Sequence, residues 1–501
     1  MSDPSSGALG VGHRLSSDPS ELLARTAFAH ELQAAPALWH GMAMADLAHA
    51  MALDDAGLLP SQWVAPLFAA LLESVDGPAV ALDPRVGDIY NNRDRWLRDA
   101  AGAAAGYLHT GRARREASTI GWQLACRERL LALGVATAEL VDTLSRVALG
   151  HVDTLMPDLT YLHRAQPTTL GHYLLGHAAP FARHLQRVDT AIRSVDASPA
   201  GSGSTNGSSL PIDRQLLADL LGFSSVIRHT RDAMWAPDIV LDINDAAFQI
   251  MLSIDRLAEE LQLFTTEGFG FAELDDAQSR TSVVMPHKKN PYSLTWLRGA
   301  ARRALGTVTG VAATMLAPSG QPDSRTFAYL DVPLLLDETT SAVQLLDRVV
   351  AGTTFDLDRL RDAASTGFTT STEICDHLSR TTALDNRTTH QIVGTAVRRA
   401  VEAGRNELEH EDLLAAADDA GIEIGLDEHA FADLVTPANA IATRVTPGGA
   451  APSEVGRMAD EMIDTAETWA ARFRTHPSHG YDIRLIQRAE PFSRTTGAAT
   501  T

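Results

Sequence analysis

The only two lysines of this 501-residue chain, Lys288 and Lys289, stand side by side in the segment Met-Pro-His-Lys-Lys-Asn-Pro at residues 285–291. The other 40 of its 42 basic residues are arginines. Arginine would serve equally well for generic charge, whereas lysine supplies a compact ammonium that acts as a point charge. Compositional accident would account for one stray lysine. A pair framed by two prolines instead indicates a chemical role, in which an ammonium stabilises negative charge.

The segment around the lysine pair, Ser-Arg-Thr-Ser-Val-Val-Met-Pro-His-Lys-Lys-Asn-Pro at residues 279–291, resembles a known signature loop. This loop, Gly-Ser-Ser-x-Met-Pro-x-Lys-x-Asn-Pro, is found in the superfamily of fumarase, aspartase and argininosuccinate lyase. The chain departs from it at Thr281 and Val283, where the family usually has Gly and Ser. The matching residues are Ser282, Met285, Pro286, Lys288, Asn290 and Pro291.

Further segments resemble argininosuccinate lyase within this superfamily, and they occur in the same order along the chain. Residues 108–115, Leu-His-Thr-Gly-Arg-Ala-Arg-Arg, are similar to its Leu-His-Thr-Gly-Arg-Ser-Arg-Asn. The other matching segments are Arg-Ala-Gln-Pro at 164–167, Leu-Pro-Ile-Asp-Arg at 210–214, Gly-Phe-Thr-Thr at 367–370 and Leu-Val-Thr-Pro-Ala-Asn at 434–439. The chain is therefore identified as an argininosuccinate lyase-like member of the superfamily, with a divergent active site.

This resemblance implies a chemistry for the loop. Enzymes of the superfamily remove a proton from the carbon next to one carboxylate and then eliminate a group from the neighbouring carbon. The carbanion spreads into the carboxylate as a dianion, so cations and hydrogen-bond donors must meet it as it forms. By resemblance, Ser282 is the base, Lys288 is the cation that favours its ionised form, and Asn290 is a donor to the carboxylate. The remaining expected substrate contacts are Met285 in this loop and, earlier in the chain, Thr160 and Gln166.

The pair that usually handles the proton of the leaving group is missing. The family's Thr-His pair aligns with Thr160 and Tyr161, and the Glu that works with this His aligns with Thr295. Two residues on, His163 stands where the family commonly has Gln. A lone histidine is often structural, but this one lies in the segment that has lost its usual His. Tyr161 is the other candidate acid, since a phenol can donate a proton although it is a poor base near neutral pH.

The segment that binds the first carboxylate in the family has changed as well, because its usual Ser and Asn are Ala113 and Arg115. Arg114 and Arg115 would either grip a carboxylate with paired N–H donors or form a solvated basic helix face. Residues 321–331 lack the arrangement of Tyr, Gln and Lys that holds the arginine part of argininosuccinate in the family. These changes predict a specialised, secondary-metabolic substrate other than argininosuccinate, with a leaving group that needs less help from an acid.

The composition restricts the class of protein. A net charge of −21 leaves no electrostatic footprint for nucleic acid. No stretch reaches the roughly 18 uninterrupted apolar residues that span a bilayer, and the start of the chain has no apolar segment typical of a signal peptide. The two distant cysteines, Cys126 and Cys375, are expected to be buried free thiols of a cytoplasmic protein. The Gly-rich residues 201–207 lack the flanking features of a phosphate-binding loop, and we expect neither a cofactor nor a metal.

Helical patterns dominate the elements that must position these residues. Long helices are predicted over 118–133, 137–155 and 294–315, and strand-like alternation is scarce. The boundaries expected are a flexible start at 1–18, helical domains at 19–111, 112–365 and 366–492, and a disordered tail at 493–501. The strongest heptad-like seam has apolar residues at Ile243, Ala247, Ile250, Ile254, Leu257, Leu261 and Phe264.

The sequence thus predicts an all-α protein with three helical domains, of which the central one is a bundle of long helices. The resemblance implies a homotetramer in which each active site is assembled from three subunits around a small dicarboxylate substrate. The predicted activity is cofactor-free anti β-elimination that breaks a carbon–nitrogen bond of a substituted succinate and releases fumarate. The alternatives are a non-catalytic structural or regulatory homologue, which loss of the His–Glu pair favours, and elimination or cycloisomerisation on another polycarboxylate.

Overall fold

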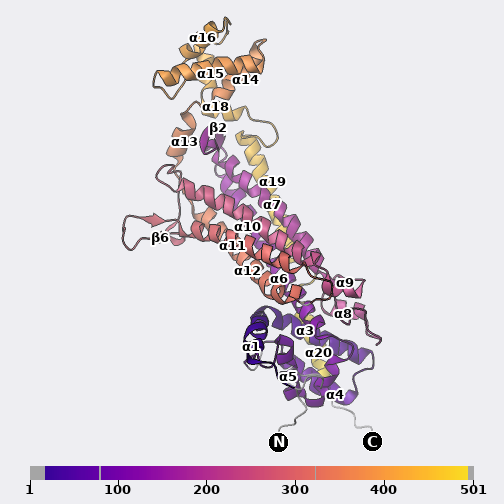
Figure 1. The fold of residues 1–501 in the computed structure, drawn as a ribbon. Coiled ribbons are helices and arrows are strands. Elements are labelled where there is room, and N and C mark those ends of the chain that lie inside the picture. Colours follow the sequence, from indigo (N-terminus) through magenta and orange to yellow (C-terminus); the bar gives the residue numbers. More distant parts are fainter. Residues whose placement is uncertain (1–16, 78–80, 322, 495–501) are drawn as a thin grey trace.

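The computed structural model describes residues 17–77, 81–321 and 323–494. Figure 1 shows an elongated molecule in which long helices form the middle and smaller helical units lie at both ends. The predicted all-α fold is confirmed, because strands occur within the described residues only as short two-stranded pairs. Among the helices of this part of the chain, none is long and apolar enough to cross a membrane.

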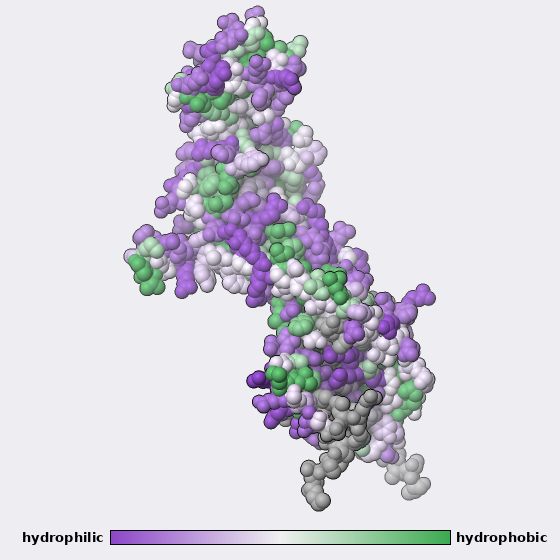
Figure 2. All heavy atoms as spheres, in the orientation of Figure 1, coloured by the Kyte–Doolittle hydropathy of each residue, from purple (hydrophilic) through white to green (hydrophobic). Residues whose placement is uncertain are grey.

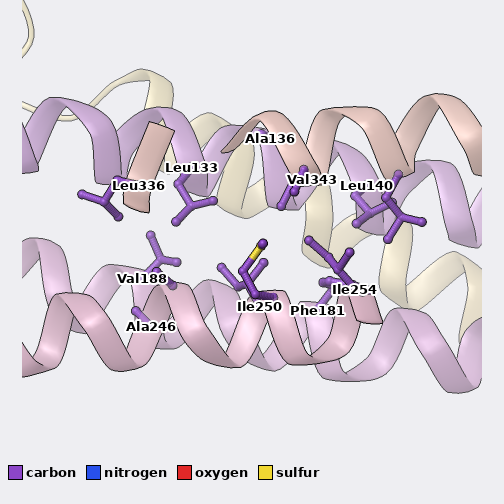
Figure 3. Packing of buried hydrophobic residues seen from close by; sticks show 14 of the residues in the cluster. Leu133, Ala136, Leu140, Phe181, Val188, Ala246, Ile250, Ile254, Leu336 and Val343 are labelled. Carbon is purple, nitrogen blue, oxygen red and sulfur yellow. The ribbon is translucent and has the colours of Figure 1, made fainter. Parts of the chain in front are cut away.

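The middle of the molecule is a bundle with one continuous apolar core. Its long helices are α6 (Arg114–Leu149), α7 (Leu170–Val195), α10 (Asp238–Phe264), α11 (Tyr292–Thr314), α12 (Asp323–Gly352) and α19 (Pro452–Arg474). Every apolar position of the predicted seam lies on α10 and is at most 3% exposed. Figure 3 shows Ile250 and Ile254 pointing from α10 into the core that Leu133 and Leu140 of α6 also line. Truncating such a residue to alanine costs about 2–5 kcal/mol, so this seam is a principal support of the bundle.

The helix α6 differs from the sequence-based expectation. Two helices were predicted over 118–133 and 137–155, whereas the structure has one continuous helix of 36 residues and starts a strand at Leu155. Gly134 lies inside this helix, and a Cβ on it would stand 2.7 Å from the Phe473 ring of α19. The glycine therefore permits close packing between two helices and does not mark a break in either.

A unit of shorter helices precedes the bundle. It contains α1 (Glu21–Leu23), the π-helical η1 (Ala24–Phe28), α2 (Ala29–Leu32), α3 (Ala35–Asp55), α4 (Ser61–Glu73), α5 (Ile89–Ala101) and the 3₁₀ helix η2 (Gly102–His109). In its interior, Asp46 accepts hydrogen bonds from Arg93 at 2.6 Å and from Arg112 at 2.5 Å. Burial opposes ionisation of Asp46, but the two guanidinium groups outweigh it and hold the pKa of this carboxyl below its usual value. Because Arg112 stands just before α6, this buried ionic group fixes where α6 begins.

The opposite end of the molecule holds α13 (Leu357–Ser365), α14 (Ser371–Thr381), α15 (Asn386–Glu402), α16 (His410–Asp419), α17 (Glu428–Leu434) and α18 (Pro437–Ala442). Helices α14 to α17 share a small apolar core. The expected C-terminal domain at 366–492 needs correction, since its last helices pack elsewhere. Val455 and Phe473 of α19 lie in the bundle core, and Tyr481 of α20 (Tyr481–Ser493) lies in the core of the N-terminal unit. The apolar faces of α19 and α20 thus complete two cores whose other residues lie far away in the sequence.

The predicted flexible start and disordered tail lie outside the described residues, apart from 17–18 and 493–494. Short elements connect the units: α8 (Arg214–Leu220), α9 (Thr230–Trp235) and the 3₁₀ helix η3 (Asp276–Gln278). The paired strands are β1 (Leu155–Thr160) with β2 (His163–Thr169), β3 (Ala197–Ser198) with β4 (Ser225–Val226), β5 (Ala272–Glu273) with β8 (Thr354–Phe355), and β6 (Arg280–Thr281) with β7 (Lys289–Asn290). The pairs β1–β2 and β6–β7 carry most of the predicted site residues.

Candidate active site

The signature loop projects from the side of the bundle as a narrow antiparallel ribbon, β6–β7 (Figure 1). Thr281 pairs with Lys289, and the backbone N–H of Ser282 donates to the Lys288 carbonyl at 3.3 Å. Directly opposite residues of an antiparallel pair share one face of the ribbon, and neighbours along a strand alternate between faces. The register therefore places Ser282 and Lys288 on one face, with Thr281 and Lys289 on the other.

The Ser282 hydroxyl oxygen is surrounded by backbone donors of its own loop. It accepts hydrogen bonds from the N–H groups of Met285 at 3.0 Å and Val284 at 3.3 Å. Such amides stabilise negative charge on oxygen, which favours the ionised hydroxyl that a base requires. Asn290 donates through Nδ2 to the Arg280 carbonyl at 3.0 Å and thereby holds the base of the ribbon together.

The two lysines have different surroundings. The Lys289 ammonium forms ion pairs with Asp276 at 2.7 Å and with Glu273 at 3.0 Å. Hydrogen bonds with Asp276 and then Glu273 raise the pKa of this ammonium. Lys288 is exposed, and within the described part of the chain nothing binds its ammonium. Lys288 is thus the lysine that is available to a ligand.

The tip of the ribbon is apolar. Val283 is 100% exposed and Val284 is 85% exposed, and Figure 2 shows hydrophobic atoms at the end of the projecting loop. The side chain of Met285 adds to the same exposed tip. Clustered apolar side chains in water mark a surface that another molecule covers, so this loop is built to meet a partner or a substrate.

The second predicted group of residues lies at the tip of the β1–β2 hairpin. Thr160 pairs with His163, and the two residues between them, Tyr161 and Leu162, have φ of 54° and 62°. A two-residue hairpin turn with positive φ at both positions usually contains Asn or Gly, so bulky residues there are strained. The ring of Tyr161 is 97% exposed, and His163 is exposed beside it. The hairpin thus holds both candidate acids out in the solvent.

The base of this hairpin is tied to the C-terminal helical unit. Gln166 on β2 donates through Nε2 to the Thr372 hydroxyl of α14 at 3.1 Å, and Arg164 donates to the Thr366 hydroxyl. The side chain of Gln166 is therefore engaged with α14 instead of the hairpin tip. Thr295, at the position of the family's Glu, lies in α11 and donates to the Pro291 carbonyl of its own chain segment at 3.4 Å.

Arg114 and Arg115 lie in the first turn of α6, far from the β6–β7 ribbon and the β1–β2 hairpin. Each of the two arginines has an acidic neighbour. Arg115 Nη1 lies 3.4 Å from Glu31 Oε2, and Arg114 Nη1 donates to the Asn91 side chain at 3.0 Å. Arg114 also lies 3.6 Å from an Asp88 carboxylate oxygen. Burial raises the pKa of Glu31, and Arg115 offsets this only in part. A ligand carboxylate would have to compete with these acids for the arginines.

One chain does not bring the predicted groups together. The 36 residues of α6 make it about 54 Å long at 1.5 Å per residue. Arg114 and Arg115 begin this helix, whereas the β1–β2 hairpin follows its other end. Figure 1 shows β2 near α18, β6 at the side of the bundle, and α5 beyond the opposite end. A single small substrate therefore cannot contact all these residues within one chain.

The structure also supplies neighbours that the sequence analysis missed. Glu273 and Asp276 bind Lys289, Glu31 binds Arg115, and Asp88 lies beside Arg114. The Gly-rich residues 201–207 bind a carboxylate of the protein itself, since the N–H groups of Gly201 and Gly203 donate to Glu116 at 2.7 and 2.8 Å. No motif marks these acids in the sequence, where they are a few among 63 acidic residues.

Comparison with known proteins places this geometry in context. The protein family described as Lyase matches residues 6–306. The argininosuccinate lyase of Methanoculleus marisnigri is 34% identical over 90% of this chain and 92% of that protein. The argininosuccinate lyase of Methanothrix thermoacetophila is 31% identical over 91% of this chain and 93% of its own length.

A solved structure of EDDS lyase in complex with formate is similar over almost the whole chain. It aligns with a TM-score of 0.85 and 25% sequence identity, covering 97% of this chain and 98% of that one. A variant of EDDS lyase with bound fumarate aligns with a TM-score of 0.84 at 25% identity over the same shares. A class II fumarase from Schistosoma mansoni has the same fold, with a TM-score of 0.71 and 13% identity over 85% of this chain and 94% of its own.

Proposed function

The chain belongs to the lyase family as an argininosuccinate lyase-like member of the fumarase/aspartase superfamily, and from this premise we propose its activity. It is a cofactor-free carbon–nitrogen lyase that acts by anti β-elimination on an N-substituted aspartate and releases fumarate and an amine. The two buried, unpaired cysteines, Cys126 and Cys375, are consistent with work in the reducing cytoplasm.

The observation that carries this proposal is the geometry of the β6–β7 ribbon. Ser282 stands opposite Lys288, and its hydroxyl oxygen already accepts two backbone N–H groups. Ionised Ser282 takes a proton from the carbon next to a substrate carboxylate, and the electron pair left behind spreads into that carboxylate. Lys288 and Asn290 meet the growing negative charge. The carbon–nitrogen bond of the neighbouring carbon then breaks, the double bond of fumarate forms, and nitrogen leaves with the bonding electrons and takes up a proton from Tyr161, His163 or water to become the amine.

We further propose that four copies of the chain assemble and share their active sites. The separation of Arg114 and Arg115 from the β6–β7 ribbon and the β1–β2 hairpin supports this. Because these residues lie too far apart within one chain, different copies must bring them to one active site. Apolar side chains on the outer faces of adjacent bundle helices support it as well. They include Leu252 of α10, Trp296 and Leu305 of α11, and Phe327 and Leu334 of α12, all of which are exposed in the single chain.

The substrate is a specialised one in this proposal, although the similar curated proteins are argininosuccinate lyases. Residues 321–331 lack the family's arrangement of Tyr, Gln and Lys around an arginine side chain, and a site without these partners rejects such a ligand strongly. Thr295 offers no carboxylate to support an acid. Both changes, in residues 321–331 and at Thr295, fit a substrate whose nitrogen leaves with little help from an acid.

The test is fumarate formation from a panel of N-substituted aspartates, argininosuccinate included, by the purified chain and by its Ser282→Ala variant. We expect release from at least one member of the panel, lost in the variant, and argininosuccinate turnover well below the roughly 1–10³ s⁻¹ typical of enzymes. Turnover of argininosuccinate in that range would instead identify argininosuccinate as the substrate. If no member releases fumarate and crystals soaked in fumarate show none bound, the chain is a non-catalytic homologue, the alternative that the missing His–Glu pair favours.

A further inference from the structure

Lys289 has no part in the proposed elimination, yet it is the better-anchored member of the lysine pair. We propose that Lys289 is a positioning residue, which clamps the β6–β7 ribbon to the body of the protein and so fixes the direction in which Ser282 and Lys288 face. This inference rests on the proposed function, because it explains how the catalytic face of that loop is presented.

The partners of Lys289 belong to elements outside the ribbon. Asp276 is the first residue of η3, and Glu273 ends β5, which pairs with β8 at the end of the bundle. The ammonium lies 2.7 Å from Asp276 Oδ1 and 3.0 Å from Glu273 Oε1. One side chain of the ribbon therefore joins it to two acids of the segment that runs from β5 into η3.

The alternation of side chains makes this contact directional. Lys288 and Lys289 are neighbours, so their side chains leave the strand on opposite faces. Holding the Lys289 face against Glu273 and Asp276 turns the other face, with Ser282 and Lys288, away from η3. If the clamp opened, the ribbon would be free to rotate about its base and the ammonium of Lys288 would lose its fixed direction.

One further contact restrains the ribbon, since the Arg280 guanidinium of β6 lies over the Tyr292 ring of α11, 5.4 Å from its centroid. Its ladder has only two paired positions, and an isolated two-stranded ribbon is marginally stable in water. The tip is fully exposed at Val283. At the base, the Asn290 side chain bridges to the Arg280 carbonyl, which holds the two strands to each other but not to the rest of the protein. The Lys289 ion pairs are thus a main link between the loop and its support.

The experiment compares Lys289→Gln and Lys289→Arg with Arg361→Gln, a matched control. Arg361 also forms an exposed ion pair, with Asp358 at 2.8 Å, but it lies on α13 outside the ribbon. Exposed ion pairs are individually weak, so we expect Lys289→Gln to lower kcat about three- to tenfold. KM should change by less than about twofold, since a misdirected loop affects the transition state more than substrate binding. Lys289→Arg should restore most of kcat, and Arg361→Gln should leave it unchanged.

Hydrogen exchange of the Val284 and Met285 amides supplies a readout that needs no substrate. These amides bond to the Ser282 hydroxyl, and they should exchange faster in Lys289→Gln but not in Arg361→Gln. Unchanged exchange would overturn the clamp, whether or not kcat falls, because a pure loss of rate would place Lys289 in the chemistry itself. If the amides exchange faster in Lys289→Gln but the protein turns over no substrate, the clamp is supported and the proposed activity is not. The two ideas are therefore tested separately.

Discussion

The β6–β7 ribbon and the β1–β2 hairpin are built alike but have kept different amounts of the family pattern. Both are antiparallel, and both expose apolar tips, Val283 on the first and Tyr161 on the second. The ribbon retains the residues that resemble the signature loop, whereas the hairpin has lost the usual His. Under the proposed mechanism, the residues that remove a proton from carbon are retained, while those that supply one to nitrogen have changed.

The two regions also differ in how they are held. The β1–β2 pair is longer, and the Arg164 and Gln166 side chains tie it to the C-terminal helical unit. The β6–β7 pair is short and reaches its support through the Lys289 ion pairs and the contact of Arg280 with Tyr292. Loops that close over substrates are drawn from the less stable parts of a fold. The pair that is held by fewer contacts is therefore the one that carries the proposed base.

The largest effect should come from Ser282→Ala, which removes the proposed base together with its hydrogen bonds from the Val284 and Met285 amides. Loss of a positioned general base lowers turnover by roughly 10²–10⁴-fold. Because Ser282 is on an exposed loop and contacts only loop amides, the melting temperature and the oligomeric state should stay the same. Fumarate release and thermal melting of the variant check both parts. Turnover close to that of the wild type would remove Ser282 from the mechanism.

Lys288→Arg tests whether the ribbon needs an ammonium or merely a charge. The planar guanidinium cannot occupy the position of the ammonium, so we expect kcat to fall by roughly 10²–10³-fold, as when a donor to a developing oxyanion is lost. The same change at Lys289 should be tolerated, which makes the neighbouring position an internal control. If Lys288→Arg were fully active, the occurrence of the lysine pair would have to be interpreted as an accident of composition.

Sequence reasoning succeeded where one local pattern decides the structure. The seam from Ile243 to Phe264 has the period of a packed helix, and its residues are buried as expected. It failed where a distant residue decides, since Gly134 looks like a break until Phe473 is seen against it. The docking of Tyr481 into the N-terminal core was hidden for the same reason.

The candidate site shows the same division. The motif positions of the ribbon and the hairpin were readable from the resemblance, because they are fixed spacings in the sequence. The acids that hold the basic residues were not. Glu273 and Asp276 are exposed, and nothing in the sequence distinguishes them from the other acidic residues. Only the turn through η3 brings them to Lys289. The distance between Arg114 and the β1–β2 hairpin likewise follows from the length of the continuous helix α6, which the sequence analysis divided in two.

Smaller effects are expected on the hairpin side of the comparison. His163→Gln restores the residue common in the family, and Tyr161→Phe removes only the hydroxyl. We expect each to change kcat by no more than a few-fold, because loss of both members of the usual acid pair fits a leaving group that departs unaided. The measurement is kcat with its pH dependence. A fall of about 10²–10⁴-fold together with loss of one limb of the pH profile would instead identify that residue as the general acid.

The smallest predicted effect concerns the strain in the hairpin turn itself. Leu162 has a φ of 62°, a conformation that costs an L-residue with a side chain roughly 1–2 kcal/mol and that glycine adopts freely. Part of this gain is cancelled because glycine has more freedom in the unfolded chain. Leu162→Gly should therefore raise the free energy of unfolding by about 0.5–1 kcal/mol, measured as an increase in melting temperature.

Leu316→Gly is the matched control, since Leu316 is also exposed but is not among the residues with positive φ. It should be neutral or destabilising. If the strained turn serves only to end a hairpin, Leu162→Gly will gain stability without losing kcat. If the strain holds Tyr161 against a substrate, the same variant will melt higher and turn over more slowly, as stabilised active sites often do. A lower melting temperature for Leu162→Gly would instead show that the leucine side chain stabilises the hairpin by more than its backbone strain costs.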